Sequence, residues 1–439
     1  LFLFVAIFVV SSLTNSTRHH EVSYLENRYD PDKRLSLEDY FKAWVEQRRD
    51  SIGAYLATHD SFPVLIVSAE GGGSRAAFWT SRVHGYIEEQ IPGYYRNHLF
   101  ALTGASGGTT GNSTFFAMKQ GGVAPGEMKG VSQKMFLENF LSSSLTLLLG
   151  ADLVQDVLGL KLNRDRGKRL EEEWSKRMES LLAPGNVNAF KEPFLQFWYD
   201  EQTRLKPDIQ PLLLINTTQV QGAGHALVSP VRIEPAAYRG MDLLDTLYKI
   251  KPEKTIPLAT ANLLNASFPF INPAGHIDSV GSFVDAGYFD NYGARVSAGI
   301  LKELAAFRAS TGDSIYSKIK FVSVLIRNST VDRARASTTA APAIQLSSQL
   351  MAPLSTISNI RSAVNDHNFW DLQHAADAFY KIDLERVPVV VKVGAEPVTP
   401  MIPLARYLSP LAIQAMDTAL DSLATDRASD LTKLVRTLK

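Results

Sequence analysis

The chain alternates between short, continuous apolar runs and longer segments in which apolar residues recur every three or four positions. Phe62-Pro-Val-Leu-Ile-Val-Ser-Ala and His98-Leu-Phe-Ala-Leu-Thr are two such runs, and runs of this kind are typical of strands buried within a parallel sheet. Helical periodicity follows each run, over residues 75–90 and 109–119. The order strand, short turn, helix therefore occurs twice.

Further segments extend this alternation. Apolar residues with helical spacing follow Ser36, a residue type that caps helix N-termini: Leu37, Tyr40, Phe41, Trp44 and Val45. We also expect helices over residues 165–182 and 410–438, the second capped by Ser409 with Pro410 in its first turn. More strands are predicted over residues 211–216, 228–233, 281–285, 320–326 and 379–384. This alternation predicts an α/β fold with a mostly parallel central sheet and helices on both faces.

Composition limits the classes of protein to which the chain can belong. The chain has 439 residues, of which 45% are hydrophobic and 21% charged, as expected for a globular protein built around one large domain. Lys plus Arg equals Asp plus Glu at 45 each, so charge gives no support to a nucleic-acid partner. Cysteine is absent, which excludes disulfides, thiolate metal sites and cysteine nucleophiles. The nine histidines form no metal-ligand cluster, and we expect neither a metal nor another cofactor.

The first ten residues, Leu1 to Val10, are all apolar. About 20 apolar residues are needed to span a bilayer, so this run is too short to do so alone. Because the chain begins with Leu, we expect residues 1–14 to be the end of a truncated transmembrane helix, or else the apolar part of a signal peptide. A polar linker and the packing helix would occupy residues 15–61, and the catalytic domain residues 62–439. We therefore expect attachment to a membrane, on a side that the sequence does not identify.

Gly104-Ala-Ser-Gly-Gly lies between a predicted strand and a predicted helix, which is the context of a nucleophile elbow. A serine at the tip of such a turn needs small neighbours so that strand and helix can approach, and Gly104 and Gly108 supply them. The N–H groups and the positive dipole end of the following helix favour a developing oxyanion. Ser106 is therefore a candidate nucleophile, although many flexible serine-glycine loops match this pattern.

A glycine-rich loop follows the preceding predicted strand. It begins after Glu70 and consists of Gly71, Gly72, Gly73, Ser74 and Arg75. Consecutive glycines leave backbone N–H groups unobstructed, as an oxyanion hole requires. The alternative is a phosphate-binding loop, but neither the dinucleotide fingerprint nor the P-loop pattern is present.

Phe283-Val-Asp-Ala-Gly places Asp285 at the end of a third predicted strand. The carboxyl ends of strands are where open α/β sheets bind ligands. An Asx turn that closes the strand is the alternative role for this residue.

Together these motifs resemble the patatin-like phospholipase family, whose signature is a D-G-G-G-x-[RK]-G loop, a G-x-S-x-G elbow and a later D-G-[GA] aspartate. The matching segments are Gly71-Gly-Gly-Ser-Arg75, Gly104-Ala-Ser106-Gly-Gly108 and Asp285-Ala-Gly287, and residues 261–273 resemble the segment that precedes the family's aspartate. The likeness covers about residues 62–326. The departures are Glu70 for Asp, Ala76 for Gly and Ala286 for Gly, and the last could misplace Asp285.

The resemblance implies a three-layer patatin-like fold and a lipid acyl hydrolase that forms a covalent acyl-enzyme. Ser106 would be the nucleophile, Asp285 its base and the loop Gly71 to Arg75 the oxyanion hole. Arg75 would fix the glycine loop or meet a phosphate headgroup, or simply pair with a carboxylate such as Glu70. The substrate would be a lipid or another acyl ester at a membrane surface, and protein partners are not indicated.

Two other interpretations stay open at the level of sequence. Ser106, Asp285 and His367 follow the chain order of an α/β-hydrolase triad. Alternatively, the protein is a catalytically inactive, membrane-tethered binding module, with Ala286 as the cause of inactivity. Residues 328–358 are rich in Ala, Ser, Thr and Pro and form either a lid or a surface connection.

Overall fold

The computed structural model describes residues 20–147, 166–222, 224–234, 238, 240–267, 272–328, 364–384, 391–393, 396–398, 402 and 407–439. The predicted apolar segment at residues 1–14 and nearly all of the predicted lid lie outside these residues. No helix among the residues described is long and apolar enough to cross a membrane.

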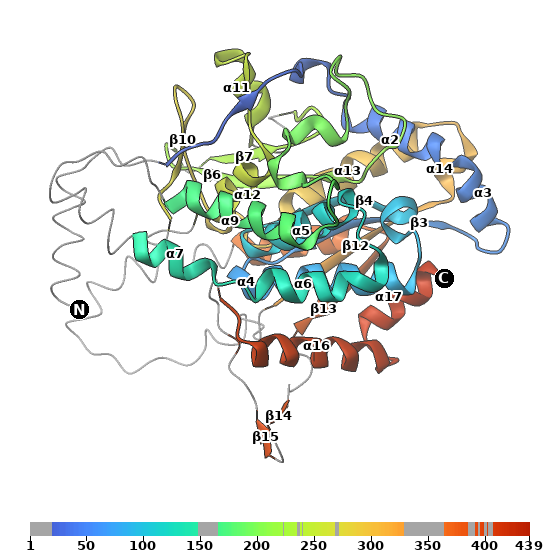
Figure 1. Ribbon diagram of the computed structural model, residues 1–439. Helices are drawn as coiled ribbons and strands as arrows, with labels where there is room; N and C mark the ends of the chain where they lie inside the picture. Colours follow the sequence, from blue (N-terminus) through green and yellow to red (C-terminus); the bar gives the residue numbers. More distant parts are fainter. Residues whose placement is uncertain are drawn as a thin grey trace, which may run out of the picture.

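A five-stranded parallel sheet forms the centre of the molecule (Figure 1), as the sequence predicts. Its strand order is β13-β12-β3-β4-β5, and each neighbouring pair is parallel. All eight residues of β3 and all six of β4 are buried, which explains their uninterrupted apolar sequence. The strands are β3 (Phe62–Ala69), β4 (Leu99–Gly104), β5 (Leu212–Leu213), β12 (Ile319–Arg327) and β13 (Ala378–Asp383).

Helices cover both faces of this sheet. Helix α4 (Gly73–Gln90) packs against α5 (Gly107–Gln120) and α6 (Met128–Phe136), whereas α13 (Ala294–Ser310) packs against β3, β4 and α2 (Leu37–Gln47). Figure 1 shows α4 and α6 on one side of the sheet and α13 and α2 on the other. The predicted α/β class with flanking helices is therefore confirmed.

A second sheet, which the sequence does not predict, lies beside the first. Its order is β1-β10-β11-β6-β7-β8, and its three central pairs are antiparallel. The strands are β1 (His20–Glu21), β6 (Ile215–Gln219), β7 (His225–Val228), β8 (Gly240–Asp242), β10 (Gly275–Ile277) and β11 (Gly281–Val284). Because they have at most five residues each, their patterns are too short to be distinctive.

Three predicted elements have different bounds in the structure. The strand predicted at 211–216 is divided, because Leu212–Leu213 pairs with β4 whereas β6 joins the second sheet. The strand predicted at 228–233 is wrong, because residues 229–233 form no strand and only Val228 belongs to β7, which ends two residues before Pro230, a residue without a backbone N–H. The helix predicted at 410–438 is two helices, α16 (Pro410–Thr425) and α17 (Asp430–Leu438).

The division of the last helix has a local cause. The Ser429 hydroxyl accepts the N–H of Thr432 at 3.1 Å and donates to the carbonyl of Leu423 at 2.6 Å. Ser429 thus caps the N-terminus of α17 and is also hydrogen-bonded to α16. Ser409 caps α16 as predicted, with its hydroxyl accepting the N–H of Ala412 at 3.1 Å.

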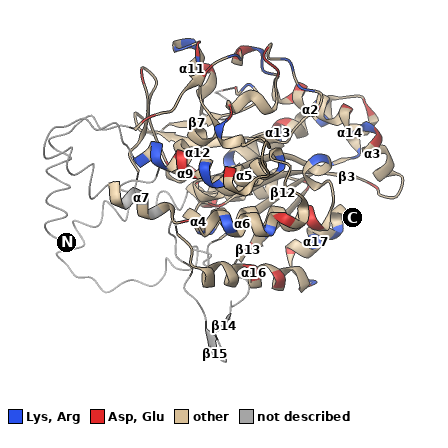
Figure 2. Ribbon diagram, viewed as in Figure 1, with Lys and Arg blue, Asp and Glu red and all other residues tan. Residues whose placement is uncertain are grey.

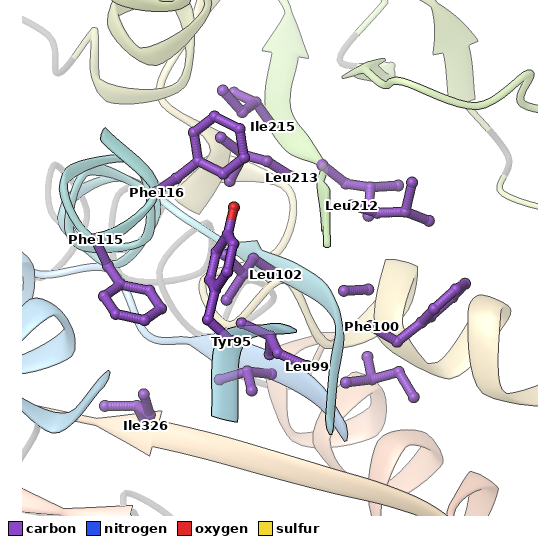
Figure 3. Packing of buried hydrophobic residues seen from close by; sticks show 14 of the residues in the cluster. Tyr95, Leu99, Phe100, Leu102, Phe115, Phe116, Leu212, Leu213, Ile215 and Ile326 are labelled. Atoms are coloured by element: carbon purple, nitrogen blue, oxygen red, sulfur yellow. The ribbon is translucent and has the colours of Figure 1, made fainter. Parts of the chain in front are cut away.

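Aromatic and aliphatic side chains fill the space between α5 and the sheet (Figure 3). The ring centroids of Tyr95 and Phe115, a residue of α5, are 5.6 Å apart. Phe100 of β4 packs instead on Phe41 of α2, with ring centroids 5.2 Å apart. Acidic and basic residues are interspersed over the described helices (Figure 2), consistent with the zero net charge.

The remaining elements lie around this core. The helices are α3 (Arg49–Leu56), α7 (Phe140–Leu147), α9 (Arg166–Leu181), α11 (Leu243–Ile250), α12 (Leu258–Ala266) and α14 (Ser314–Ser317). The strands are β2 (Leu25–Glu26), β9 (Lys254–Thr255), β14 (Val391–Val393) and β15 (Glu396–Val398), which form two separate pairs, β2 with β9 and β14 with β15.

Candidate active site

Ser106 lies at the tip of a sharp turn between β4 and α5, where it is the N-cap of α5 and only partly buried. Its backbone has φ 49° and ψ −123°, a conformation that costs a residue with a side chain about 1–3 kcal/mol. Gly104 and Gly108 permit this turn, because a Cβ on either residue would lie against the carbonyl oxygen of Ala69. Ser106 thus lies at a tight strand-to-helix turn between small residues, which is the backbone geometry that a nucleophile elbow requires.

Three asparagine side chains hold the elbow, and sequence reasoning identified none of them. The Nδ2 groups of Asn112, Asn216 and Asn265 donate to the carbonyls of Thr103, Gly104 and Ser106 at 2.6, 2.8 and 2.9 Å. Asn265 Oδ1 also accepts the N–H of Ser106 at 2.9 Å. At about 1 kcal/mol for each hydrogen bond, the two bonds of Asn265 offset much of the strain at Ser106.

The glycine loop lies directly beside Ser106. A Cβ on Gly71 would be 3.2 Å from the Cβ of Ser106. The N–H of Gly71 donates to the carbonyl of Asn291 at 2.8 Å, so it is already engaged. Gly72 and Gly73 are partly exposed, and Gly73 has φ 59°, a left-handed conformation that favours glycine.

Asn328, immediately after β12, fixes the shape of this loop. Its N–H donates to Glu70 Oε2 and its Nδ2 to the carbonyl of Gly71, both at 2.9 Å. Its Oδ1 accepts from Arg75 Nε at 2.9 Å. Arg75 thus contacts the glycine loop through Asn328, and its Nη1 also donates to the carbonyl of Ile402 at 3.2 Å. Ser74 is buried in the first turn of α4.

Asp285 directly follows β11 and is buried, with an exposed fraction of 3%. Its Oδ1 accepts the N–H of Gly287 at 2.8 Å, which is an Asx turn that also orients the carboxyl group. Ala286 begins the 3-10 helix η7 (Ala286–Tyr288), a conformation open to any L residue. The substitution of alanine for glycine therefore causes no strain at this position.

Two separate elements bring the elbow and Asp285 together. On α12, Asn265 binds the backbone of Ser106, and two residues later the carbonyl of Ser267 accepts the N–H of Asp285 at 3.1 Å. On β6, Asn216 binds the carbonyl of Gly104, and two residues later the Thr218 hydroxyl donates to the carbonyl of Asp285 at 3.1 Å. The same two elements thus anchor both candidate residues.

The chain after Asp285 also wraps around the elbow. Gly293 lies against Gly104, and its carbonyl accepts from the Thr103 hydroxyl at 3.0 Å. Burial raises the pKa of the Asp290 carboxyl, whereas hydrogen bonds from the backbone N–H groups of Arg295 and Tyr292 partly oppose the shift. This buried carboxylate organises the turn that carries Asn291 to the glycine loop.

Two histidines bear on the interpretation of the site. His367 is exposed, on a helical stretch spanning residues 364–375. The buried ring of His225 stacks on Phe289, with centroids 4.8 Å apart, and its Nε2 donates to Asn216 Oδ1 at 2.8 Å. Burial lowers the pKa of His225 to about 4. Its ring is therefore neutral near pH 7, and its Nε2 holds the Asn216 side chain that binds the elbow.

No group of three or more His, Asp or Glu side chains that could hold a metal ion is present in the described part of the chain. The candidate site thus consists of a serine at a strand-to-helix turn, a partly exposed pair of loop glycines and a buried aspartate.

Neither a protein-family model nor a curated protein sequence matches the chain. Among solved structures, VipD from Legionella pneumophila is similar at a TM-score of 0.32 and 11% identity, over 83% of this chain and 67% of that one. Human GIVD cytosolic phospholipase A2 is similar at a TM-score of 0.35 and 12% identity, over 70% of this chain and 48% of that one. The same human enzyme in complex with methyl gamma-linolenyl fluorophosphonate gives a TM-score of 0.32 and 15% identity, over 70% and 46%.

The chain thus spans about half the length of the human phospholipase chains that it matches. Because these TM-scores are all below 0.5, the structural similarities do not support any particular function for this chain.

Proposed function

We propose that the protein is a lipid acyl hydrolase of the patatin-like type that uses Ser106 and Asp285 as a catalytic dyad. The observation that carries this proposal is the pair of bridges, through α12 and β6, that anchor the elbow serine and the aspartate to the same two elements. A strained serine beside a glycine loop, with a buried carboxylate fixed nearby, is an arrangement suited to acyl transfer.

In the proposed reaction, Asp285 accepts the hydroxyl proton of Ser106 as Oγ attacks the carbonyl carbon of the ester. The tetrahedral intermediate collapses, the alcohol leaves with the proton that Asp285 had accepted, and the acyl group stays on Ser106. Water then attacks the acyl-enzyme and gives a proton to Asp285, which returns it to Ser106 Oγ as the bond to the acyl group breaks and the free acid is released. The proposed dyad needs no histidine.

The hydrogen bonds around Ser106 restrict which groups can stabilise the oxyanion. The N–H groups of Gly71, Ser106 and Gly108 donate to Asn291, Asn265 and Ala105. We therefore assign the oxyanion hole to the partly exposed Gly72 and Gly73, rather than to the whole loop from Gly71 to Arg75. Each well-placed donor contributes about 3 kcal/mol to the transition state.

Labelling with a fluorophosphonate tests the nucleophile directly, because this reagent forms a covalent adduct with an activated serine. The full chain is incubated with the probe, and the adduct is located by peptide mass spectrometry. We expect modification of Ser106 in the parent and none in Ser106→Ala. An unlabelled parent, or label on a different serine, would overturn the proposal.

Hydrolysis of a fluorogenic phospholipid in vesicles, compared with that of a short p-nitrophenyl ester in solution, tests the substrate class. A lipid hydrolase should release acid from the vesicles. Turnover of the short ester alone would restrict the function to a simple esterase.

A further inference from the structure

We propose that Asn265 is a positioning residue that sets the geometry of the dyad, an inference that rests on the function proposed for Ser106 and Asp285. Asn265 is in the last turn of α12, 159 positions from Ser106 in the sequence. No part of its side chain is exposed. It therefore acts through the backbone of Ser106 and not on a substrate.

The two amide atoms of Asn265 bind the two peptide groups on either side of the Ser106 Cα. Oδ1 accepts the Ser106 N–H, and Nδ2 donates to the Ser106 carbonyl, both at 2.9 Å. Rotation of Ser106 away from φ 49° would break both bonds. One planar side chain thus defines the direction in which the Ser106 hydroxyl leaves the turn.

The same end of α12 also positions Asp285. Ser267 is the C-cap of this helix, and its hydroxyl donates to the carbonyl of Leu263 at 2.8 Å. Its carbonyl accepts the N–H of Asp285 at 3.1 Å. Because Asn265 and Ser267 are two positions apart, the end of α12 fixes the separation of the nucleophile from its base.

The Asn265 amide has a second effect on the site. It engages the Ser106 N–H, so that this group does not compete with Gly72 and Gly73 for the oxyanion. Loss of the amide would remove both bonds that hold the Ser106 backbone and so relax the elbow. We expect this relaxation to slow the chemical step and to leave substrate binding unchanged, since the Asn265 side chain is buried.

Steady-state kinetics of Asn265→Ala and Asn265→Asp test this inference, with kcat expressed per fluorophosphonate-reactive site so that misfolded protein is not counted. Asp keeps the acceptor for the Ser106 N–H but places an oxygen against the Ser106 carbonyl. We expect kcat to fall about 100-fold in both variants, the cost of a misplacement of roughly 1 Å, with KM close to that of the parent.

Asn262→Ala is the matched control. Asn262 is one turn earlier on α12, is equally buried, and makes no side-chain hydrogen bond to any residue that the structure describes. Its variant should keep the kcat of the parent. The contrary outcome is that Asn265→Ala and Asn262→Ala lower the melting temperature alike and that both keep the parental kcat. In that case Asn265 has only a structural role, and the inference fails while the proposed function stands. A parent that neither reacts with the probe nor hydrolyses esters overturns both.

Discussion

Replacement of Gly108 by alanine perturbs the closest approach between the elbow helix and the sheet. The new Cβ would lie against the carbonyl oxygen of Ala69, and 2.6 Å from both the carbonyl carbon of Ala69 and the carbonyl oxygen of Glu70. All three atoms belong to the backbone, so no side chain can rotate away. The clash must instead separate α5 from the end of β3.

The expected change in the free energy of unfolding follows from two opposing effects. Overpacking in a dense core costs up to about 3 kcal/mol, whereas alanine is favoured over glycine within a helix by about 1 kcal/mol. We therefore expect Gly108→Ala to lower the free energy of unfolding by about 2 kcal/mol. The Ala69 carbonyl also accepts the N–H of Ala105 at 3.1 Å, so the displacement should reach Ser106 and lower kcat about 100-fold.

Gly130→Ala in α6 is the matched control, because a Cβ there would meet no atom within 4 Å. It should raise the free energy of unfolding by up to about 1 kcal/mol and leave ester hydrolysis unchanged. Urea unfolding and steady-state kinetics measure both quantities. The reasoning is refuted if the two variants change stability in the same direction, or if Gly108→Ala keeps full activity.

Two further predictions concern buried charge. Burial lowers the pKa of His225 to about 4 from its ordinary value of 6.5. Between these two pH values the unfolded chain binds a proton that the folded chain does not, so the free energy of unfolding falls as the pH is lowered. The contribution of neutral His225 to stability is therefore complete above about pH 6.5 and is lost as the pH falls to about 4. His225→Gln should remove on the order of 3 kcal/mol of the pH dependence in that window, as measured by urea unfolding, and an unchanged slope would contradict it. Arg82 Nε donates to Asp417 Oδ1 at 2.7 Å in the interior between α4 and α16. Arg82→Ala should lower the free energy of unfolding by about 3–5 kcal/mol. The double variant Arg82→Met with Asp417→Leu should recover most of this loss in stability. Equal stability of the single and double variants would refute this account.

The parallel sheet could be predicted because strands buried on both faces have continuous apolar sequences, as β3 and β4 do. The turn at Ser106 could also be predicted, because Gly104 and Gly108 stand two residues before and two after it, although the contacts that require them are mainly with Ala69 at the end of β3. The second sheet could not, because its strands are short and its pairings, such as β11 with β6, join distant parts of the chain.

The residues that hold the candidate site could not be predicted from local sequence patterns, for the same reason. Asn265 and Asn216 are 159 and 112 positions from the residues that they bind. A buried asparagine in an apolar helix has no distinctive spacing, although residues 261–273 resemble a segment of the patatin-like family. Asn328 is the first residue of the segment 328–358, which the sequence predicts to be either a lid or a surface connection, and the structure shows it hydrogen-bonded to Glu70 and Gly71.

The most direct test of the central claim is the hydrolysis of a p-nitrophenyl ester and a fluorogenic phospholipid by the parent and by Ser106→Ala, Asp285→Asn and His367→Ala. Loss of turnover in the first two variants, with parental rates in the third, is the result that a Ser106 and Asp285 dyad predicts. Full turnover by Ser106→Ala or Asp285→Asn would contradict the account, and loss of turnover in His367→Ala would replace the dyad with a triad.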